Sequence, residues 1–369
     1  MPPPFSDVTE LLLGGVRSRA FPAAAIEVGG TSGVLWRRTF GALSYEETAL
    51  PATADTIFDL ASLTKVIATA SLAMRAVDEE RFSLEDRVAQ WLPAWTGTDR
   101  EEVTIADLLA HASGLTAYLP LYVDHTRRLD FEPAICGLPL EYVPRTRALY
   151  SDLGFILLGF ILEDAQPRTA DYTGTPGAVD PSRRLQAQFD RWARAVTTEP
   201  LAFNPPRAWR DRTAPTELDL WRGRLLVGEV HDENAWALGG AAGHAGLFGT
   251  VGAVGDFARA VLATIAGAPA LARPETMHRF MSRGTVPGSS RALGWDTMLP
   301  TSSCGRTLSP DAIGHTGFTG TSLWIDHQRD LYIVLLTNRV CPSRENEQLR
   351  ALRPRVHEAV VSAFDRHFR

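Results

Sequence analysis

Segments that favour β-strands occur in pairs near the two ends of the chain. The four segments are residues 23–28, 33–40, 322–326 and 331–337, and a short turn joins the members of each pair. Apolar residues at helical spacing precede the first pair, from Val8 to Val16, and follow the last pair, from Val356 to Phe368. The two ends of the chain therefore predict one antiparallel sheet covered by terminal helices.

The middle of the chain favours helices instead. Helical stripes or fully apolar runs occupy residues 63–77, 105–110, 153–162 and 254–265, and stretches rich in Pro, Gly and Thr occupy residues 167–182 and 203–217. We interpret the chain as an α/β (α+β) fold in two parts. A split sheet domain comprises residues 1–75 and 290–369, a mainly helical insertion comprises residues 76–289, and the active site is expected in the cleft between them.

Composition and charge exclude several classes of partner. The chain has 369 residues and a formal net charge of -6, so it has no broad basic field to attract nucleic acid or anionic lipid. It has no run of about eighteen apolar residues to span a membrane, and residues 1–20 lack the pattern of a secretory signal. Three widely spaced cysteines give no disulfide framework. We expect a cytoplasmic protein that acts on a small molecule, with no nucleic-acid or membrane partner.

Motifs for cofactors are also missing from the sequence. The glycine-rich residues 243–246 lack Gly-Lys-Ser/Thr, and no G-x-G-x-x-G opens a helix. His231, Asp232 and Glu233 are possible metal ligands, but they lack the spacing of a helical zinc motif. We expect neither a metal nor another cofactor.

Lysine occurs once in the chain, at Lys65. Lysine and arginine together number 37, so the other 36 (37 minus 1) are arginine. Arginine stays protonated in proteins, whereas a lysine removed from water can lose its proton and act as a base. The position that keeps lysine is therefore a candidate for such chemistry.

A serine precedes this lysine by three residues, in Ser62-Leu63-Thr64-Lys65. A serine hydroxyl needs a neighbouring base and a site for the developing oxyanion before it attacks a carbonyl group. Residues three apart on a helix share a face, so the amine can reach the hydroxyl. Asp59 indicates that the helix starts close to Ser62, where its positive end favours a neutral amine at Lys65. Ser62 and Lys65 are the candidate nucleophile and base.

Two further motifs follow in the chain. Tyr-Ser-Asp at residues 150–152 precedes the apolar helix, and Gly-His-Thr-Gly at residues 314–317 leads into the third strand. The order Ser-x-x-Lys, Tyr-x-(Asn) and (Lys)-Thr-Gly resembles the serine β-lactamase and penicillin-binding-protein-like family. The likeness is strongest to class C β-lactamases, D,D-peptidases and the esterases on that fold, and it covers nearly the whole chain.

The resemblance implies a role for each matching position. Ser62 would form an acyl-enzyme, Lys65 would help to deprotonate it, and Tyr150 would relay protons to the leaving group and from water. The backbone N–H groups of Ser62 and Phe318 would form the oxyanion hole, the second on the edge strand. The predicted substrate and oxyanion residues are Asp152, His315, Thr316, Gly317 and Phe318.

Two positions depart from the family pattern. Asp152 stands where asparagine is usual, and an ionised carboxylate there would raise the pKa of Lys65. His315 stands where lysine is usual, so a permanent cation is missing and a partly charged imidazole replaces it. We hypothesise that Asp152 and His315 pair across the cleft and leave the pocket near neutral, which favours uncharged substrates.

Each of these residues also has a purely structural interpretation. Tyr150 could pack as an aromatic residue before the buried helix, and Asp152 could cap that helix. His315 could be a structural histidine at a strand end. We expect His111 to be buried and hydrogen-bonded in support of the site, and His244 to belong to a structural turn.

The favoured function is acyl transfer to water through Ser62, by an esterase acting on small uncharged esters or amides. The alternatives on the same fold are a D-amino-acid peptidase or D,D-carboxypeptidase, or a weak β-lactamase. An alternative from another class is a catalytically inactive penicillin-binding-like binding module.

Overall fold

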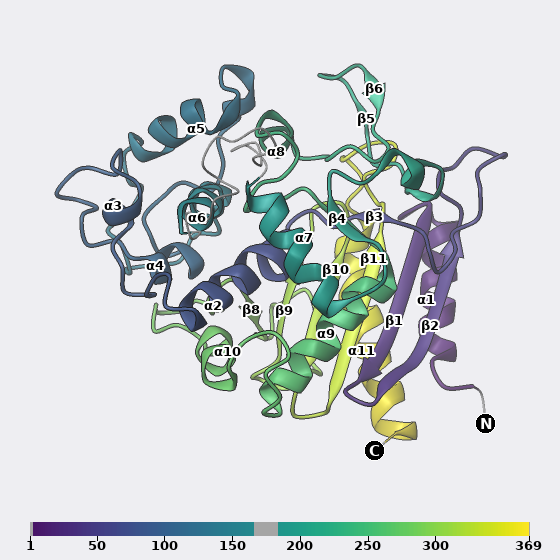
Figure 1. The fold of residues 1–369 in the computed structure, drawn as a ribbon. Helices are drawn as coiled ribbons and strands as arrows, with labels where there is room; N and C mark the ends of the chain where they lie inside the picture. Colours follow the sequence, from purple (N-terminus) through teal and green to yellow (C-terminus); the bar gives the residue numbers. More distant parts are fainter. Residues whose placement is uncertain (1–2, 166–183, 369) are drawn as a thin grey trace.

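The computed structural model describes residues 3–165 and 184–368, so the loop expected at residues 167–182 lies outside the described residues. Its main feature is a six-stranded antiparallel sheet formed by both ends of the chain (Figure 1). From edge to edge the strands are β2 (Gly33–Gly41), β1 (Ala23–Gly30), β11 (Leu331–Thr337), β10 (Ser322–Asp326), β9 (Ile313–Thr316) and β8 (Asp296–Thr297). The predicted sheet is confirmed, including the hairpin that pairs Asp326 with Leu331.

Helices cover both faces of this sheet. The covering helices are α1 (Ser6–Arg17), α11 (Gln348–His367) and α9 (Val251–Ile265). Side chains alternate between the faces of a strand, so Ile26 and Ile333 pack in the cluster that contains residues of α1 and α11, whereas Val334 and Leu336 pack in the larger cluster with α9. Because both faces are covered, β1 and β11 are buried along their whole length.

The remaining helices and short helical turns are η1 (Lys65–Ala70), α2 (Ser71–Asp78), α3 (Val88–Trp91), α4 (Ile105–Leu109), η2 (Leu121–Val123), α5 (Arg127–Cys136), α6 (Asp152–Asp164), α7 (Arg184–Val196), η5 (Arg207–Arg212), α8 (Glu233–Ala237) and α10 (Pro274–Met281). Helices α2, α3, α4, α5 and α6 gather beyond β8, whereas α7 packs against β4 (Leu201–Phe203) and α9 (Figure 1). Helix α6 is buried on nearly all sides, as its apolar sequence predicts. No helix in the described residues is both long and apolar enough to cross a bilayer.

Two small sheets complete the structure. They are β3 (Phe58–Asp59), β7 (Leu247–Gly249) and β4 (Leu201–Phe203) in one, and β5 (Leu218–Asp219) and β6 (Arg224–Leu225) in the other. The division into residues 1–75 with 290–369 and residues 76–289 stays a prediction. Helix α9 belongs to the second range by sequence, yet it packs against β1 and β11.

Candidate active site

Ser62 lies on a tight turn between β3 and η1. The buried Asp59 carboxylate holds this turn, because it accepts the backbone N–H of Ala61 at 2.8 Å and that of His231 at 2.8 Å. Ala61 has a left-handed φ of 47°, a conformation that costs a non-glycine residue about 1–3 kcal/mol. The turn is thus held in a strained form immediately before Ser62, and the helix begins directly after it.

Lys65 is completely buried, and its amine contacts three acceptors. Nζ lies 2.9 Å from Ser62 Oγ, 2.7 Å from Asp152 Oδ1 and 3.1 Å from the carbonyl oxygen of His244. An ammonium group uses all three of its N–H donors in this arrangement. A neutral amine could keep the contacts with Asp152 and His244 and turn its lone pair toward the Ser62 hydroxyl.

The charge of Lys65 depends on Asp152. Burial lowers the pKa of Lys65, but the Asp152 carboxylate and Tyr150 outweigh burial, so the pKa lies above its ordinary value. The expectation of a neutral amine near pH 7 is therefore wrong for the free protein, because it took account of the helix end and not of this ion pair. The expected effect of a carboxylate at position 152 on this pKa is confirmed.

Asp152→Asn should therefore move the pH dependence of hydrolysis. Asparagine keeps an acceptor for Nζ but removes the charge, so the pKa of Lys65 falls and more of it is neutral at any given pH. If the neutral amine is the base, the rising limb of kcat/KM moves to lower pH and activity at pH 7 increases. The measurement is kcat/KM against pH for both proteins.

Asp296→Asn is the matched control for this change. It removes a carboxylate that lines the same cavity but has no recorded contact with Lys65, so the limb should stay in place. If kcat/KM rises at the same pH in Asp152→Asn and in the unmodified protein, the ionisation of Lys65 does not determine that pH.

Asp152 is the first residue of α6, and the residue before it, Ser151, is the N-cap of this helix. The hydroxyl of Ser151 accepts the backbone N–H of Gly154 at 3.3 Å, so the interpretation of Asp152 as the cap is wrong. The Asp152 side chain is 20% exposed and turns toward Lys65. Its role in the structure is that of counter-ion to the lysine.

Tyr150 packs among the other candidate residues. Its ring centroid lies 4.8 Å from Lys65 Nζ, 4.7 Å from the ring of His111 and 5.7 Å from the ring of His315. Burial raises the pKa of Tyr150, and the charge of Lys65 together with hydrogen bonds to Lys65 and Ser62 only partly opposes this. The phenol is therefore protonated at neutral pH and holds a proton that it can donate.

His315 is buried and does not pair with Asp152. Its Nδ1–H donates to the carbonyl oxygen of Thr316 at 2.8 Å. Burial, followed by the charges of Arg291 and Lys65, lowers the pKa of His315 well below its usual range. The hypothesis of an Asp152–His315 pair is therefore wrong, and so is the expectation of a partly charged imidazole at neutral pH.

Gly317 brings the end of β9 against the segment that precedes Ser62. A side chain on Gly317 would come within 2.5 Å of the Leu60 carbonyl oxygen, so this approach requires glycine. Phe318 lies in the turn between β9 and β10, not on an edge strand as expected. In the described part of the chain, the backbone N–H groups of Ser62 and Phe318 have no recorded acceptor.

A cavity of about 630 Å³ opens over these residues. The predicted site residues in its lining are Ser62, Tyr150, Asp152, His315, Thr316, Gly317 and Phe318, and Lys65 is buried beneath them. Arginines also line it, and within the described residues no carboxylate partner is recorded for Arg291, Arg339 or Arg353. The cavity thus contains permanent cations, contrary to the expectation of a pocket without one.

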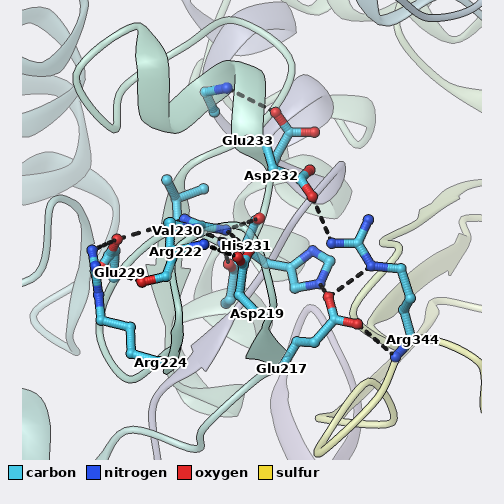
Figure 2. A network of polar contacts seen from close by, with 12 residues as sticks. Glu217, Asp219, Arg222, Arg224, Glu229, Val230, His231, Asp232, Glu233 and Arg344 are labelled. Atoms are coloured by element: carbon cyan, nitrogen blue, oxygen red, sulfur yellow. Dashed lines mark hydrogen bonds and ion pairs between the residues drawn. The ribbon is translucent and has the colours of Figure 1, made fainter. Parts of the chain in front are cut away.

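A network of ion pairs, missed by the sequence analysis, borders the cavity (Figure 2). Glu217 contacts His231 Nε2 at 2.9 Å and Arg344 Nε at 2.7 Å, and Arg344 reaches Glu233 at 2.6 Å. Burial tends to raise the pKa of Glu217, but hydrogen bonds from His231 and Arg344 hold it at about 2. The ring of His231 stacks on Phe318, so the network supports the turn that carries the second predicted oxyanion donor.

His111 and His244 also contact residues of the site. His111 is buried and accepts the backbone N–H of Ser151 at 3.0 Å, as expected of a supporting residue. His244 places its carbonyl oxygen on Lys65, while its Nε2 contacts Asp232 Oδ1 at 2.8 Å. The contact with Lys65 is made by a backbone atom, which leaves no side-chain signal in the sequence.

Comparison with known proteins identifies relatives of this chain. The sequence model of the family named Beta-lactamase matches residues 8–357. A curated relative from Escherichia coli (strain K12), named "Putative D-alanyl-D-alanine carboxypeptidase", is 28% identical over 349 residues, which are 86% of this chain and 79% of that protein.

Two solved structures share the fold. EstCE1, a hydrolase with promiscuous acyltransferase activity, superposes with a TM-score of 0.72 at 20% identity and covers 96% of this chain and 97% of its own. A class C beta lactamase from Rhodobacter sphaeroides superposes with a TM-score of 0.72 at 17% identity, over 96% of this chain and 98% of its own. At these identities the likeness shows the fold alone.

Proposed function

Because the chain belongs to the beta-lactamase family and is a serine hydrolase, we propose that Ser62 is its nucleophile and that Lys65 is the base. The observation that carries the proposal is the 2.9 Å contact between Lys65 Nζ and Ser62 Oγ at the cavity wall. The single lysine of the chain therefore lies where a proton acceptor is needed.

Acylation then proceeds by one attack and three proton transfers. Lys65, once neutral, takes the Ser62 proton as Oγ bonds to the carbonyl carbon of the substrate. The backbone N–H groups of Ser62 and Phe318 stabilise the oxyanion. Tyr150 gives its proton to the leaving group as the bond to it breaks, and Lys65 returns a proton to Tyr150. Water releases the acyl group by the same steps in reverse.

We propose small esters and amides as the substrates, with esters cleaved faster because their leaving groups depart more easily. The sequence-based preference for uncharged substrates rested on a pocket without permanent cations, and the arginines of the cavity remove that reason. A carboxypeptidase acting on peptides with a free carboxylate is therefore the second candidate. The name of the Escherichia coli relative supports it as well.

A substrate panel tests this proposal. It comprises short-chain nitrophenyl esters, an acylated D-alanyl-D-alanine peptide, its L-alanyl counterpart and nitrocefin, each with Ser62→Ala as blank. We expect turnover of the esters that is absent from the blank. Faster hydrolysis of the D-peptide than of the esters would favour the second candidate, and a blank as active as the unmodified protein would exclude Ser62.

A further inference from the structure

The cavity over Ser62 extends to the start of helix α11. Arg350 and Arg353 of this helix line it, and so does Arg339, which follows β11. Arg350 is exposed and pairs with Glu347 at 3.0 Å, whereas Arg339 and Arg353 are buried. The proposed mechanism uses none of these arginines. Two buried cations therefore line the α11 end of the cavity without a role in the reaction.

Arg353 has no counter-ion in the part of the chain that the structure describes. The residue is 8% exposed, no hydrogen bond or ion pair of its guanidinium is recorded, and its Nε is fully enclosed. Burial, followed by the charges of Arg339 and Arg350, lowers the pKa of Arg353 to about 10, so the side chain is still charged at neutral pH. One turn further along α11, burial lowers the pKa of His357 to about 3, so this neighbour is neutral. A buried charge is expected to have a counter-ion, and no carboxylate of the described residues fills that role.

Arg339 brings a second cation to the same place. Its Cγ and the Cδ2 of Leu349 both lie against Gly320, and Leu349 is one helical turn before Arg353. The Nε of Arg339 donates to the carbonyl oxygen of Phe318 at 3.0 Å, and its Nη1 donates to two further backbone carbonyl groups. Among the described residues no partner is recorded for its Nη2. Arg339 therefore has donors left for a ligand while it holds the turn that carries Phe318.

The charge at this end of the cavity selects the class of ligand. A carboxylate would neutralise only one of the two guanidinium groups, whereas a phosphate or phosphomonoester carries about two negative charges near neutral pH. Guanidinium groups match phosphate oxygens with paired N–H donors. The positive end of α11 adds to the attraction, because Arg353 belongs to the second turn of this helix.

We propose that Arg339 and Arg353 bind a phosphate dianion, or the phosphoryl group of a phosphomonoester, at the α11 end of the cavity. The two ligands present the same charge and the same oxygens to the arginines. A phosphoryl group bound here would share the cavity with Ser62, and either ligand would fix Arg339 and with it the Phe318 turn. The inference does not require that Ser62 is the nucleophile.

Calorimetric titration of the unmodified protein tests the ligand class. Sodium phosphate, methyl phosphate and sodium acetate are added in turn at pH 7.5, with the ionic strength kept constant by sodium chloride. Phosphate should bind and raise the thermal unfolding midpoint, and acetate should bind at least about tenfold more weakly, since it offsets one charge only. No binding of either phosphate, or acetate binding as tight as phosphate, would overturn the inference.

Methyl phosphate distinguishes the two sources of the phosphoryl group. Its binding with an affinity similar to that of phosphate would mean that the site accepts a phosphoryl group attached to a larger molecule, such as a substrate. Binding of inorganic phosphate alone would assign the site to the free ion. Both results support a phosphate site at this place.

Arg353→Met should weaken phosphate binding about tenfold to a hundredfold, as for lost charged hydrogen bonds. Without phosphate its thermal unfolding midpoint should not fall, because the substitution removes an unpaired buried charge and keeps a long side chain. Arg355→Met is the matched control. It makes the same change at an exposed residue of α11 outside the lining of this cavity, and phosphate affinity should stay the same.

Two further variants separate this site from the catalytic centre. Arg291→Gln removes another cation of the cavity, and Ser62→Ala removes the proposed nucleophile; both should keep the phosphate affinity of the unmodified protein. Since the titration needs no turnover, a failure of Ser62 as nucleophile would leave these expectations in place. Phosphate affinity that is lost in Arg291→Gln but kept in Arg353→Met would contradict the inference, even if Ser62-dependent hydrolysis is observed.

Discussion

Replacing Ser62 by alanine is expected to reduce ester hydrolysis on the order of 10⁶-fold, the effect of removing a nucleophilic serine from a machinery that acts as a unit. The hydroxyl is the only group of Ser62 that can bond covalently to the substrate. It contacts the side chains of Lys65 and Tyr150. The measurement is kcat/KM for a nitrophenyl ester.

Folding has to be checked alongside this loss of activity. Ser62 lies at the cavity wall rather than in the core, so the thermal unfolding midpoint of Ser62→Ala should stay close to that of the unmodified protein. A folded Ser62→Ala protein that retains a large share of the ester hydrolysis would assign the activity to another residue.

Lys65→Arg should lower kcat about 10²- to 10⁴-fold, the contribution of a positioned general base. The variant keeps the positive charge opposite Asp152, but a guanidinium cannot accept the Ser62 proton. The measurement is kcat over a range of pH. The loss should persist at high pH, where the amine of the unmodified protein is neutral.

Because Lys65 is fully buried, Lys65→Arg could lose activity through misfolding alone, so a second variant is needed. Lys65→Ala leaves space beside Ser62 Oγ and Asp152, which small primary amines such as methylamine can enter. Added amine should restore part of the activity in proportion to its neutral fraction. Near-normal turnover of Lys65→Arg, or no response of Lys65→Ala to any amine, would remove Lys65 from the proton transfer.

The sheet and the main helices could be predicted because each rests on a local pattern. The strands at residues 322–326 and 331–337 are seen from consecutive residues, and α6 from an unbroken apolar run. Glu27, buried in the middle of β1, shows the limit of such patterns. Its partners, which include Tyr332 at 2.7 Å and Arg259 at 3.3 Å, come from distant elements.

The contact between Ser62 and Lys65 could be anticipated because one helical turn joins the two residues. The contact between Asp152 and Lys65 could not be anticipated, because the two residues are 87 positions apart. It depends on how α6 packs against the segment that carries Lys65. Arg291 could not be identified as a cavity residue from the sequence, for a related reason. It belongs to no motif, and only the folded chain brings it to the ring of Tyr150.

The most direct test of the mechanism is to identify the residue that reacts covalently with a reagent for nucleophilic serines. The unmodified protein, Ser62→Ala and Lys65→Arg are incubated with an alkyl fluorophosphonate, and the modified peptide is identified by mass spectrometry. The mechanism predicts one adduct per chain on Ser62, none in Ser62→Ala and slow formation in Lys65→Arg. An adduct on a different residue, or an unmodified Ser62 in a protein that hydrolyses esters, would contradict it.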